Sequence, residues 1–287
     1  MDLSIIIVSW NVKEKLIENL KAIYSSCGKF SFEIFVIDNN SLDGSAKMVK
    51  KMFPSVRLIA NRENLGFAKA CNQGLALAKG RYHLLLNPDM RVFENTLNTM
   101  ISLLDENPRA AISGCKLVNE DGGIIKQVRS FPKLFDQLAI LLKLPHLFPK
   151  ILNKYLVVNF DYNKNSQVSS IRGAFFVIRA ESFKLPIKLD ERYFLWFEEV
   201  DFCKQAKKRG KEVWYFSEVK CLDFVGQSFS QVKSSKTQKY FIDSMLKYFR
   251  KWHPSWQYYI LKVLSYPLIA LTYIVKDILK IKTKLRT

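Results

Sequence analysis

The chain has 287 residues, 48% of them hydrophobic, and a formal net charge of +19. This length and hydrophobic content fit one large domain with a sizeable core and exclude wholesale disorder. The positive charge indicates an anionic partner: a phosphorylated substrate, an acidic membrane surface or nucleic acid. The five cysteines form no CxxC pair, which argues against a zinc site and favours reduced thiols in the cytosol. The chain begins directly with an apolar strand and no basic leader, so no signal peptide is predicted.

Apolar strands alternate with helical patterns at short intervals in the first part of the chain. The expected strands cover residues 3–9, 33–37, 56–60 and 82–86, with helices beginning near residues 11, 45 and 67. This alternation is typical of a doubly wound parallel sheet. Each strand ends in polar residues, and the carboxyl ends of parallel strands form the edge at which ligands bind. The sequence therefore predicts one polar crevice, which contains Ser9, Asn11, Asp38, Asn40, Asn61, Asn64, Asn87 and Asp89.

The fourth of these strands runs directly into Asn87, Pro88 and Asp89. Its three consecutive leucines suit a strand that is buried on both faces. The Asn-Pro pair ends regular strand pairing, and the turn then presents a carboxylate where a metal or a phosphate would be bound. The alternative is a solvated turn aspartate without a function.

The second part of the chain is predicted to be less regular. We expect a helix at 94–106, strands at 110–118 and 173–179, and short strands near 213–216 and 219–222. Residues 127–165 are irregular and aromatic, which is typical of a long loop with helical pieces that covers a site. The aromatic run 193–197 leads into a helix whose first turn carries Glu198, Glu199 and Asp201. Negative charge is favourable there because of the helix dipole.

The C-terminal segment has a different composition. Residues 234–252 read as a basic amphipathic helix, and residues 256–284 are rich in Tyr, Leu and Ile before a final group of lysines. The uncharged run 263–275 is too short to span a bilayer. An apolar stretch with aromatic flanks and lysines favours a helix that lies on an anionic membrane surface. The alternatives are a terminal helix docked on the domain and a dimer contact.

Several motifs follow one another along the chain. They are Val8-Ser9-Trp10-Asn11, the Val-Ile-Asp-Asn-Asn-Ser-Leu-Asp-Gly-Ser segment 36–45, Asn64-Leu65-Gly66-Phe67 with Asn72-Gln73-Gly74, and Leu85-Leu86-Asn87-Pro88-Asp89. The later motifs are Arg129-Ser130-Phe131-Pro132, Gly173-Ala174, the segment 190–201 and Gly226-Gln227-Ser228. In order and spacing these motifs resemble the family 2 inverting glycosyltransferases, and the later ones resemble the rhamnosyltransferase-like branch. The resemblance covers roughly residues 3–255.

This resemblance implies the α/β fold called GT-A, with a Rossmann-like, mostly parallel central sheet and flanking helices. A GT-A domain is then expected at 1–233, with a donor half at about 1–118 and an acceptor half at about 119–233. Residues 234–287 would form a helical C-terminal appendage.

The family's donor site supplies the first set of expected roles. By resemblance, Asp38 accepts a hydrogen bond from the imide N–H of uracil or thymine, although a helix-capping turn is the structural alternative. Asp89 matches the last aspartate of the family's Asp-x-Asp motif, which binds a divalent cation (Mg²⁺ or Mn²⁺), and Asn87 replaces the first. The expected donor-binding residues are Ser9, Asn11, Asp38, Asn40, Asn64, Gly66, Asn72, Asn87 and Asp89.

The acceptor side supplies the second set. The acceptor hydroxyl must lose a proton as it attacks, which requires a positioned carboxylate. In the family this base is the aspartate of a Glu-Asp pair, and Glu199 occupies that place here. The expected acceptor-binding residues are Glu198, Asp201, Trp196 and Gly173. The alternative is that these acidic residues are only the favourable negative charges at the start of a helix and have no role in a reaction.

Asp223 is a departure from the family pattern. It stands three residues before Gly226, where the family usually has a histidine that binds the metal. An aspartate also suits a hard cation, so the metal site is expected to include Asp89 and Asp223. The departure is equally consistent with weakened metal dependence or a changed activity.

The resemblance implies transfer of rhamnose or a similar sugar from a dTDP- or UDP-sugar to a hydroxyl of a glycan or polyprenyl-linked acceptor. Such a reaction belongs to cell-surface polysaccharide synthesis, at the cytoplasmic face of the plasma membrane and in contact with anionic lipid. The alternative is a degenerate GT-A scaffold that binds membranes or nucleic acid. The basic residues match no known nucleic-acid module, so no nucleic-acid partner is expected. No Gly-x-Gly-x-x-Gly or P-loop motif supports a nicotinamide or P-loop enzyme.

Overall fold

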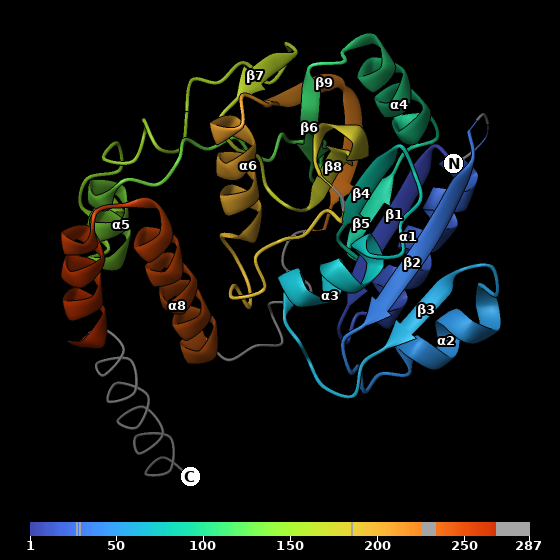
Figure 1. Cartoon of the computed structure of the whole chain (residues 1–287), viewed down its shortest axis with the longest axis horizontal. Coiled ribbons are helices and arrows are strands. Elements are labelled where there is room, and N and C mark those ends of the chain that lie inside the picture. The colour runs from blue at the N-terminus through green and yellow to red at the C-terminus, as the bar shows by residue number, and fades with distance from the viewer. Residues whose placement is uncertain (27, 29, 185, 225–233, 268–287) are drawn as a thin grey trace.

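The computed structural model describes residues 1–26, 28, 30–184, 186–224 and 234–267, and its elements form one sheet with helices around it (Figure 1). The strands are β1 Leu3–Ser9, β2 Phe32–Asp38, β3 Arg57–Ala60, β4 Tyr82–Leu86, β5 Met90–Val92, β6 Ala110–Val118, β7 Ser166–Val168, β8 Phe175–Arg179 and β9 Glu212–Asp223. The helices are α1 Lys13–Ser26, α2 Ser45–Met52, α3 Phe67–Leu75, α4 Thr96–Glu106, α5 Leu134–Leu141, α6 Glu198–Lys208 and α8 Ser234–Trp252. Short 3₁₀ helices are η1 Leu144–His146 and η2 Ala180–Ser182.

The sheet has the order β3-β2-β1-β4-β8-β6-β9-β5, with β7 paired to β9. The first four strands of this order are all parallel, which confirms the predicted doubly wound half. Successive side chains along these strands point to opposite faces of the sheet, and each face has its own core. Ile5 and Leu84 share a core with α1, whereas Ile6 and Leu85 share a second core with α3. Because these strands are buried on both faces, their continuous apolar runs are required.

The remaining strands make the sheet mixed. β8 runs antiparallel between β4 and β6, β9 is parallel to β6, and β5 pairs antiparallel with the end of β9. The two short strands expected near 213–216 and 219–222 are one strand. Its pairing with β6 shifts between Cys115 and Lys116, whose partners are Phe216 and Lys220, and the irregularity interrupts the apolar alternation in the sequence.

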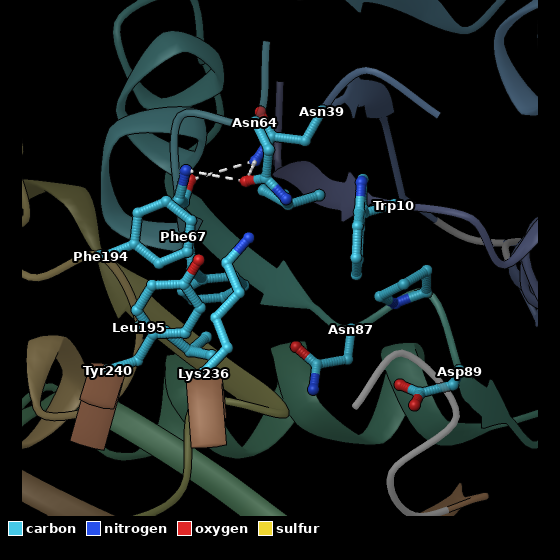
Figure 2. A pocket seen from close by; sticks show the side chains of 13 residues that line it. Trp10, Asn39, Asn64, Phe67, Asn87, Asp89, Phe194, Leu195, Lys236 and Tyr240 are labelled. Carbon is cyan, nitrogen blue, oxygen red and sulfur yellow. Dashed lines mark hydrogen bonds between the residues drawn. The ribbon is translucent and has the colours of Figure 1, made fainter. Parts of the chain in front are cut away.

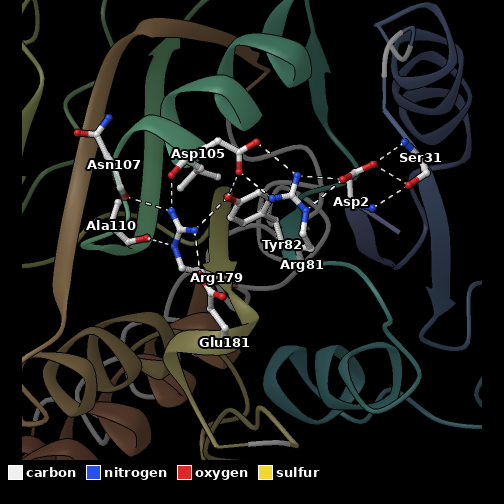
Figure 3. A network of polar contacts seen from close by, with 10 residues as sticks. Asp2, Ser31, Arg81, Tyr82, Asp105, Asn107, Ala110, Arg179 and Glu181 are labelled. Atoms are coloured by element: carbon white, nitrogen blue, oxygen red, sulfur yellow. Dashed lines mark hydrogen bonds and ion pairs between the residues drawn. The ribbon is translucent and has the colours of Figure 1, made fainter.

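A polar network closes the edge of the sheet formed by the amino ends of the parallel strands (Figure 3). Arg81 forms ion pairs with Asp2 and Asp105, at 2.9 and 2.8 Å. The buried guanidinium of Arg179 donates to the Tyr82 hydroxyl and to backbone carbonyls, among them that of Ala110. These bonds tie β1, β4, β8 and α4 together at the edge opposite the predicted crevice.

The C-terminal elements pack on α5 and α6, to one side of the sheet in Figure 1. α8, which was predicted at 234–252, shares an apolar cluster with α5, the aromatic run before α6 and the helical residues 255–267. No helix in the described ranges is both long and apolar enough to cross a membrane. The motif at 226–228 and residues 268–287 of the predicted interfacial helix lie outside the described residues.

Candidate functional site

A pocket of about 270 Å³ lies at the carboxyl ends of the parallel strands (Figure 2). It is formed by the strand ends, the loop before α3, the segment before α6 and the first turns of α8. Its lining residues are Val8, Trp10, Asn39, Asn64, Gly66, Phe67, Asn87, Pro88, Asp89, Phe194, Leu195, Lys236 and Tyr240. Four of the predicted donor residues are thus brought together here: Asn64, Gly66, Asn87 and Asp89.

Asn39, which sequence reasoning passed over, organises the β2 side of the pocket. Its amide nitrogen donates to Asn64 Oδ1 at 3.1 Å and to the Gly66 carbonyl at 3.2 Å. Asn61 donates to its amide oxygen at 3.0 Å. The neighbouring Asn40, a predicted donor residue, is exposed with φ 66° and does not line the pocket. Asn39 therefore lines the pocket, whereas Asn40, with its left-handed backbone, does not.

Ser9 and Asp38 end adjacent strands in register with one another, and both side chains are buried. Asp38 Oδ2 accepts a bond from the backbone N–H of Ser41 at 3.0 Å. Asp38 Oδ1 and Ser9 Oγ have no hydrogen-bond partner among the described residues. Most buried polar atoms in proteins are paired, so these two unpaired atoms indicate a donor that a ligand or water supplies.

Asn11 shapes the loop beside this strand end. It has φ 53°, and its backbone N–H donates to Ser41 Oγ while its side chain accepts the N–H of Leu42 at 2.7 Å. This predicted donor residue therefore fixes the loop that follows Asp38.

The loop before α3 leaves no room for a side chain at its glycine. A Cβ on Gly66, whose φ is +83°, would lie 2.5 Å from the Phe194 carbonyl oxygen. That same oxygen accepts the N–H of Phe67 at 2.7 Å. The close approach joins the donor side of the pocket to the aromatic run that precedes α6.

The Asn-Pro-Asp turn after β4 is held from two sides. The N–H of Asn87 donates to the Ala174 carbonyl at 2.9 Å, and Asn19 of α1 donates to the carbonyls of Asn87 and Met90. Asp89 is only 5% exposed, and its backbone carbonyl accepts the N–H of Phe224 at 3.2 Å. Asp89 is therefore a fixed carboxylate at the pocket wall and not a solvated turn residue.

The residues around Asp89 fit a cation that arrives with its own phosphate ligands. No group of three or more His, Cys, Asp or Glu side chains in the described part of the chain could hold a metal alone. Asp223 is 3% exposed and forms an ion pair with Arg172 at 3.3 Å, so its charge is already partly balanced. Mg²⁺ is commonly bound by one or two carboxylates together with substrate phosphates, and Asp89 meets that requirement.

Glu198 and Glu199 begin α6 directly after a strained segment. Trp196 and Phe197 have φ values of 64° and 69°, a region that bulky residues rarely adopt and that is concentrated at functional sites. The position of a Cβ on Gly173 lies 3.5 Å from Glu199 Cβ, an ordinary contact distance, so Gly173 lies directly beside this carboxylate. Oε2 of both glutamates is buried and lacks a hydrogen-bond partner among the described residues.

Burial sets the protonation of this pair. It raises the pKa of Glu198 well above its usual value, and the neighbouring Glu199 charge raises it further. Burial also raises the pKa of Glu199, against the opposing effect of backbone hydrogen bonds and of Arg172. A carboxyl with a raised pKa is a stronger base than an ordinary glutamate, which suits proton abstraction near neutral pH.

Replacing Glu198 with glutamine is expected to stabilise the protein more at alkaline than at acid pH, because burial raises the pKa of Glu198. A carboxyl whose pKa is raised by folding stabilises the fold below its unfolded-state pKa, and this contribution is lost as the pH rises through the folded-state pKa. Glu198→Gln avoids that loss, so its Tm should exceed the parent's by a few degrees at pH 8 and by less at pH 5. Differential scanning calorimetry measures the difference. The exposed Glu120→Gln is the control, and an equal gain at both pH values would contradict the assignment.

Three predicted ligand residues contact other parts of the protein. Instead of facing the acceptor, Asp201 is completely buried and accepts bonds from Lys251, Gln205 and Trp252 at 2.5–2.8 Å. It therefore anchors α8. Asn72 does not line the pocket. Its side-chain oxygen accepts the backbone N–H of Leu189 at 2.8 Å, and its side-chain nitrogen donates to the Leu189 carbonyl at 2.9 Å. Trp196, a predicted acceptor residue, packs edge-on against Phe241 of α8.

Besides Asn39, the pocket residues missed from the sequence include Phe67, Phe194, Lys236 and Tyr240. Phe67 and Phe194 belonged to recognised motifs, and their aromatic character was the available signal. Lys236 and Tyr240 lie far along the chain on α8, in the segment predicted as a basic amphipathic helix. No local pattern places them at the ends of β1 and β4.

Comparisons with known proteins agree with this geometry. The family model described as Glycosyl transferase family 2 matches residues 4–184. An N-acetylglucosaminyl-diphospho-decaprenol L-rhamnosyltransferase of Mycobacterium tuberculosis (strain ATCC 25618 / H37Rv) is 23% identical over 62% of this chain and 61% of its own length. The rhamnosyltransferase WbbL of Escherichia coli (strain K12) is 27% identical over 74% of this chain and 79% of its own.

A solved structure shows the same fold. The crystal structure of S. aureus TarS 1-349 in complex with UDP aligns with a TM-score of 0.57 at 16% identity, covering 87% of this chain and 66% of that one. At such identity the likeness concerns the fold alone, which is the GT-A fold expected from the motifs. The chain spans about three fifths of the length of the tuberculosis relative. Because the family model covers most of the chain, including β1 to β8 and the whole Asn-Pro-Asp turn, the protein belongs to glycosyl transferase family 2.

Proposed function

We propose that the protein is an inverting glycosyltransferase that moves rhamnose or a similar sugar from a dTDP- or UDP-sugar to an acceptor hydroxyl. One observation carries the proposal. The pocket at the carboxyl ends of the strands contains the fixed carboxylate of Asp89, and the segment before α6 that forms its far wall leads directly to Glu199. A donor diphosphate and an acceptor base are both required for this chemistry.

The nucleobase would bind at the ends of β1 and β2. Asp38 Oδ1 is an unpaired acceptor, and the imide N–H shared by uracil and thymine is a suitable donor. Ser9, next to it in register, would supply a further polar contact. Asn39, Asn64 and Gly66 form the adjoining wall through their hydrogen bonds to one another.

Asp89 would hold a divalent cation together with the donor diphosphate, with Asn87 beside it. When bound, the cation neutralises the charge that develops on the leaving diphosphate as the glycosidic bond breaks. Asp223 supports this site through its place opposite Met90 and its pairing with Arg172.

Glu199 would take the proton of the acceptor hydroxyl as that oxygen attacks the anomeric carbon. The new carbon–oxygen bond forms on the face opposite the leaving diphosphate, the old bond breaks, and the anomeric configuration inverts. Gly173 leaves space beside Glu199, and Glu198 and Trp196 flank it in sequence. The carboxylate must be deprotonated to act, so turnover falls as the pH drops through its raised pKa.

The acceptor class rests on the relatives. The tuberculosis relative is named for a rhamnosyl transfer to N-acetylglucosaminyl-diphospho-decaprenol, and a relative from Bacillus subtilis is named as a minor teichoic acid biosynthesis protein. A polyprenyl-linked or glycan acceptor in cell-surface polysaccharide synthesis is accordingly proposed for this chain.

A transfer assay tests the function. The purified protein is incubated with Mn²⁺, a dTDP- or UDP-sugar and an N-acetylglucosamine acceptor linked by a diphosphate to a short polyprenol. The expected product carries the donor sugar with inverted anomeric configuration, assigned by NMR. Retention of configuration, or nucleotide binding without transfer to any lipid-linked or glycan acceptor, would overturn the proposal.

We also propose peripheral contact with an anionic membrane surface at the cytoplasmic face. Apolar side chains are exposed on two elements that share one apolar cluster, the α5–η1 region and the helical residues 255–267. Leu147 and Phe148 are 73% and 60% exposed, and Val263 and Tyr266 are 66% and 62% exposed. Lys143 and Lys150 in the first element and Lys262 in the second would meet anionic headgroups.

Removing this apolar surface is expected to release the protein from vesicles. The double variant Leu147→Ser/Val263→Ser should bind phosphatidylglycerol vesicles at least about tenfold more weakly in co-sedimentation, because it loses two side chains that insert into the interface. Leu42→Ser/Leu77→Ser, at exposed leucines elsewhere on the molecule, is the matched control. Equal binding of both variants and the parent would exclude this surface.

A further inference from the structure

The first turns of α8 form one wall of the pocket, although α8 lies outside the segment that the family model matches. Lys236 and Tyr240 are one helical turn apart and both line the pocket. Figure 2 shows the Lys236 side chain extending from α8 into the pocket, between Asn64 and Phe67 on one side and Asn87 and Asp89 on the other. The appended helix is therefore part of the site.

α8 is held in this position by contacts near both of its ends. The ring of Tyr240 stacks on Phe194 with centroids 4.4 Å apart. Phe194 in turn accepts the Phe67 N–H through its carbonyl. At the other end of the helix, Lys251 and Trp252 bond the buried carboxylate of Asp201. This anchoring presents Lys236 to the pocket from a fixed helix.

The charge balance of the pocket identifies what Lys236 meets. Among the described residues that line it, Lys236 is the sole cation and Asp89 the sole anion. The Lys236 ammonium lies 5.8 Å from the Tyr240 ring centroid, and no carboxylate of the described chain pairs with it. A diphosphate needs more positive charge than one divalent cation on Asp89 supplies. An unpaired ammonium that reaches into the same pocket answers that need.

We propose that Lys236 binds the diphosphate of the donor, so that α8 completes the donor site from outside the core of the domain. This inference rests on the proposed function, because it takes a nucleoside diphosphate sugar as the ligand. The ammonium donates charge-assisted hydrogen bonds to phosphate oxygens, and Tyr240 keeps the helix in place. The contact is to the phosphates and not to the base.

Lys236→Ala tests this directly, with Lys239→Ala as the control because Lys239 is an exposed lysine on the same helix that does not line the pocket. Affinities for dTDP, UDP, thymidine and uridine are measured by calorimetry with Mn²⁺ at low salt. We expect Lys236→Ala to weaken the binding of dTDP and UDP about tenfold and to leave the affinities for thymidine and uridine unchanged. The loss should shrink as salt is added.

The outcomes separate the two proposals. If the parent binds neither diphosphate, the proposed function fails. If the parent binds them and Lys236→Ala binds equally well, or if nucleoside affinity falls by the same factor, the diphosphate contact is overturned. Lys236→Arg should keep most of the affinity, because it keeps the charge. A loss in Lys236→Arg as large as that in Lys236→Ala would contradict a role based on charge.

Discussion

Glu199→Gln should bind the nucleotide-sugar donor as the parent protein does, yet turn it over about 10²- to 10⁴-fold more slowly, the usual contribution of a general base. Glutamine fills the same space beside Gly173 but cannot accept the acceptor proton. Donor affinity measured by calorimetry and turnover measured by release of nucleoside diphosphate separate the two effects. Glu199→Asp keeps the carboxylate on a shorter side chain and should recover part of the rate.

Two controls make the Glu199 result specific. Glu106→Gln changes an exposed carboxylate at the end of α4 and should leave both affinity and turnover unchanged. The pH dependence of kcat/KM in the parent should show a fall towards acid at a pH above the ordinary glutamate pKa, because burial raises the pKa of Glu199. Substantial residual turnover in Glu199→Gln would assign the base to another group.

Asp89→Asn is expected to remove the metal-dependent part of donor binding. Asparagine keeps the size of the side chain but loses the charge that a divalent cation requires. The cation's contribution to donor binding is several kcal/mol, and its loss corresponds to roughly a hundredfold or more in affinity. In the parent, dTDP and UDP should each bind more tightly with Mn²⁺ than with EDTA. In the variant, the two conditions should give the same affinity for each nucleotide. The thermal unfolding of the free protein should change little.

Asp121→Asn, at an exposed turn far along the chain, is the matched control and should behave as the parent. If Asp89→Asn keeps the full manganese effect, the cation is held elsewhere, and Asp223 is the first alternative. In that case breaking the Arg172 pair with Arg172→Gln should strengthen Mn²⁺ binding, since it removes a positive charge beside the Asp223 carboxylate.

The parallel half of the fold was predictable because its signals are local. Each of β1, β2 and β4 is a continuous apolar run followed by a polar end, and the βα alternation leaves few arrangements for such strands. β5 and β7 were missed because three residues carry no periodicity. The shift at Cys115 and Lys116 hid the continuity of β9, since a bulge breaks the alternation that defines a strand.

The site was predictable where a motif meets a strand end and unpredictable where side-chain direction or distant packing decides. Asp89 lines the pocket as expected, but the choice of Asn39 over Asn40 depends on one backbone dihedral. Asp201 looked like a ligand because it stands in an acidic helix start, yet Lys251 and Trp252, some 50 residues later, bury it. Lys236 reaches the pocket only through the tertiary docking of α8, which no local sequence pattern reveals.

The most direct test of the account is a calorimetric titration of UDP and dTDP into the parent protein, with Mn²⁺ and again with EDTA. A pocket that contains the Asp89 carboxylate and the Lys236 ammonium, beside strand ends that carry the unpaired Asp38 acceptor, predicts binding of at least one of these nucleotides, clearly tighter when the cation is present. Binding that is indifferent to Mn²⁺ would contradict the role of Asp89. The absence of binding by either nucleotide to a folded sample would contradict the assignment of this crevice as a donor site.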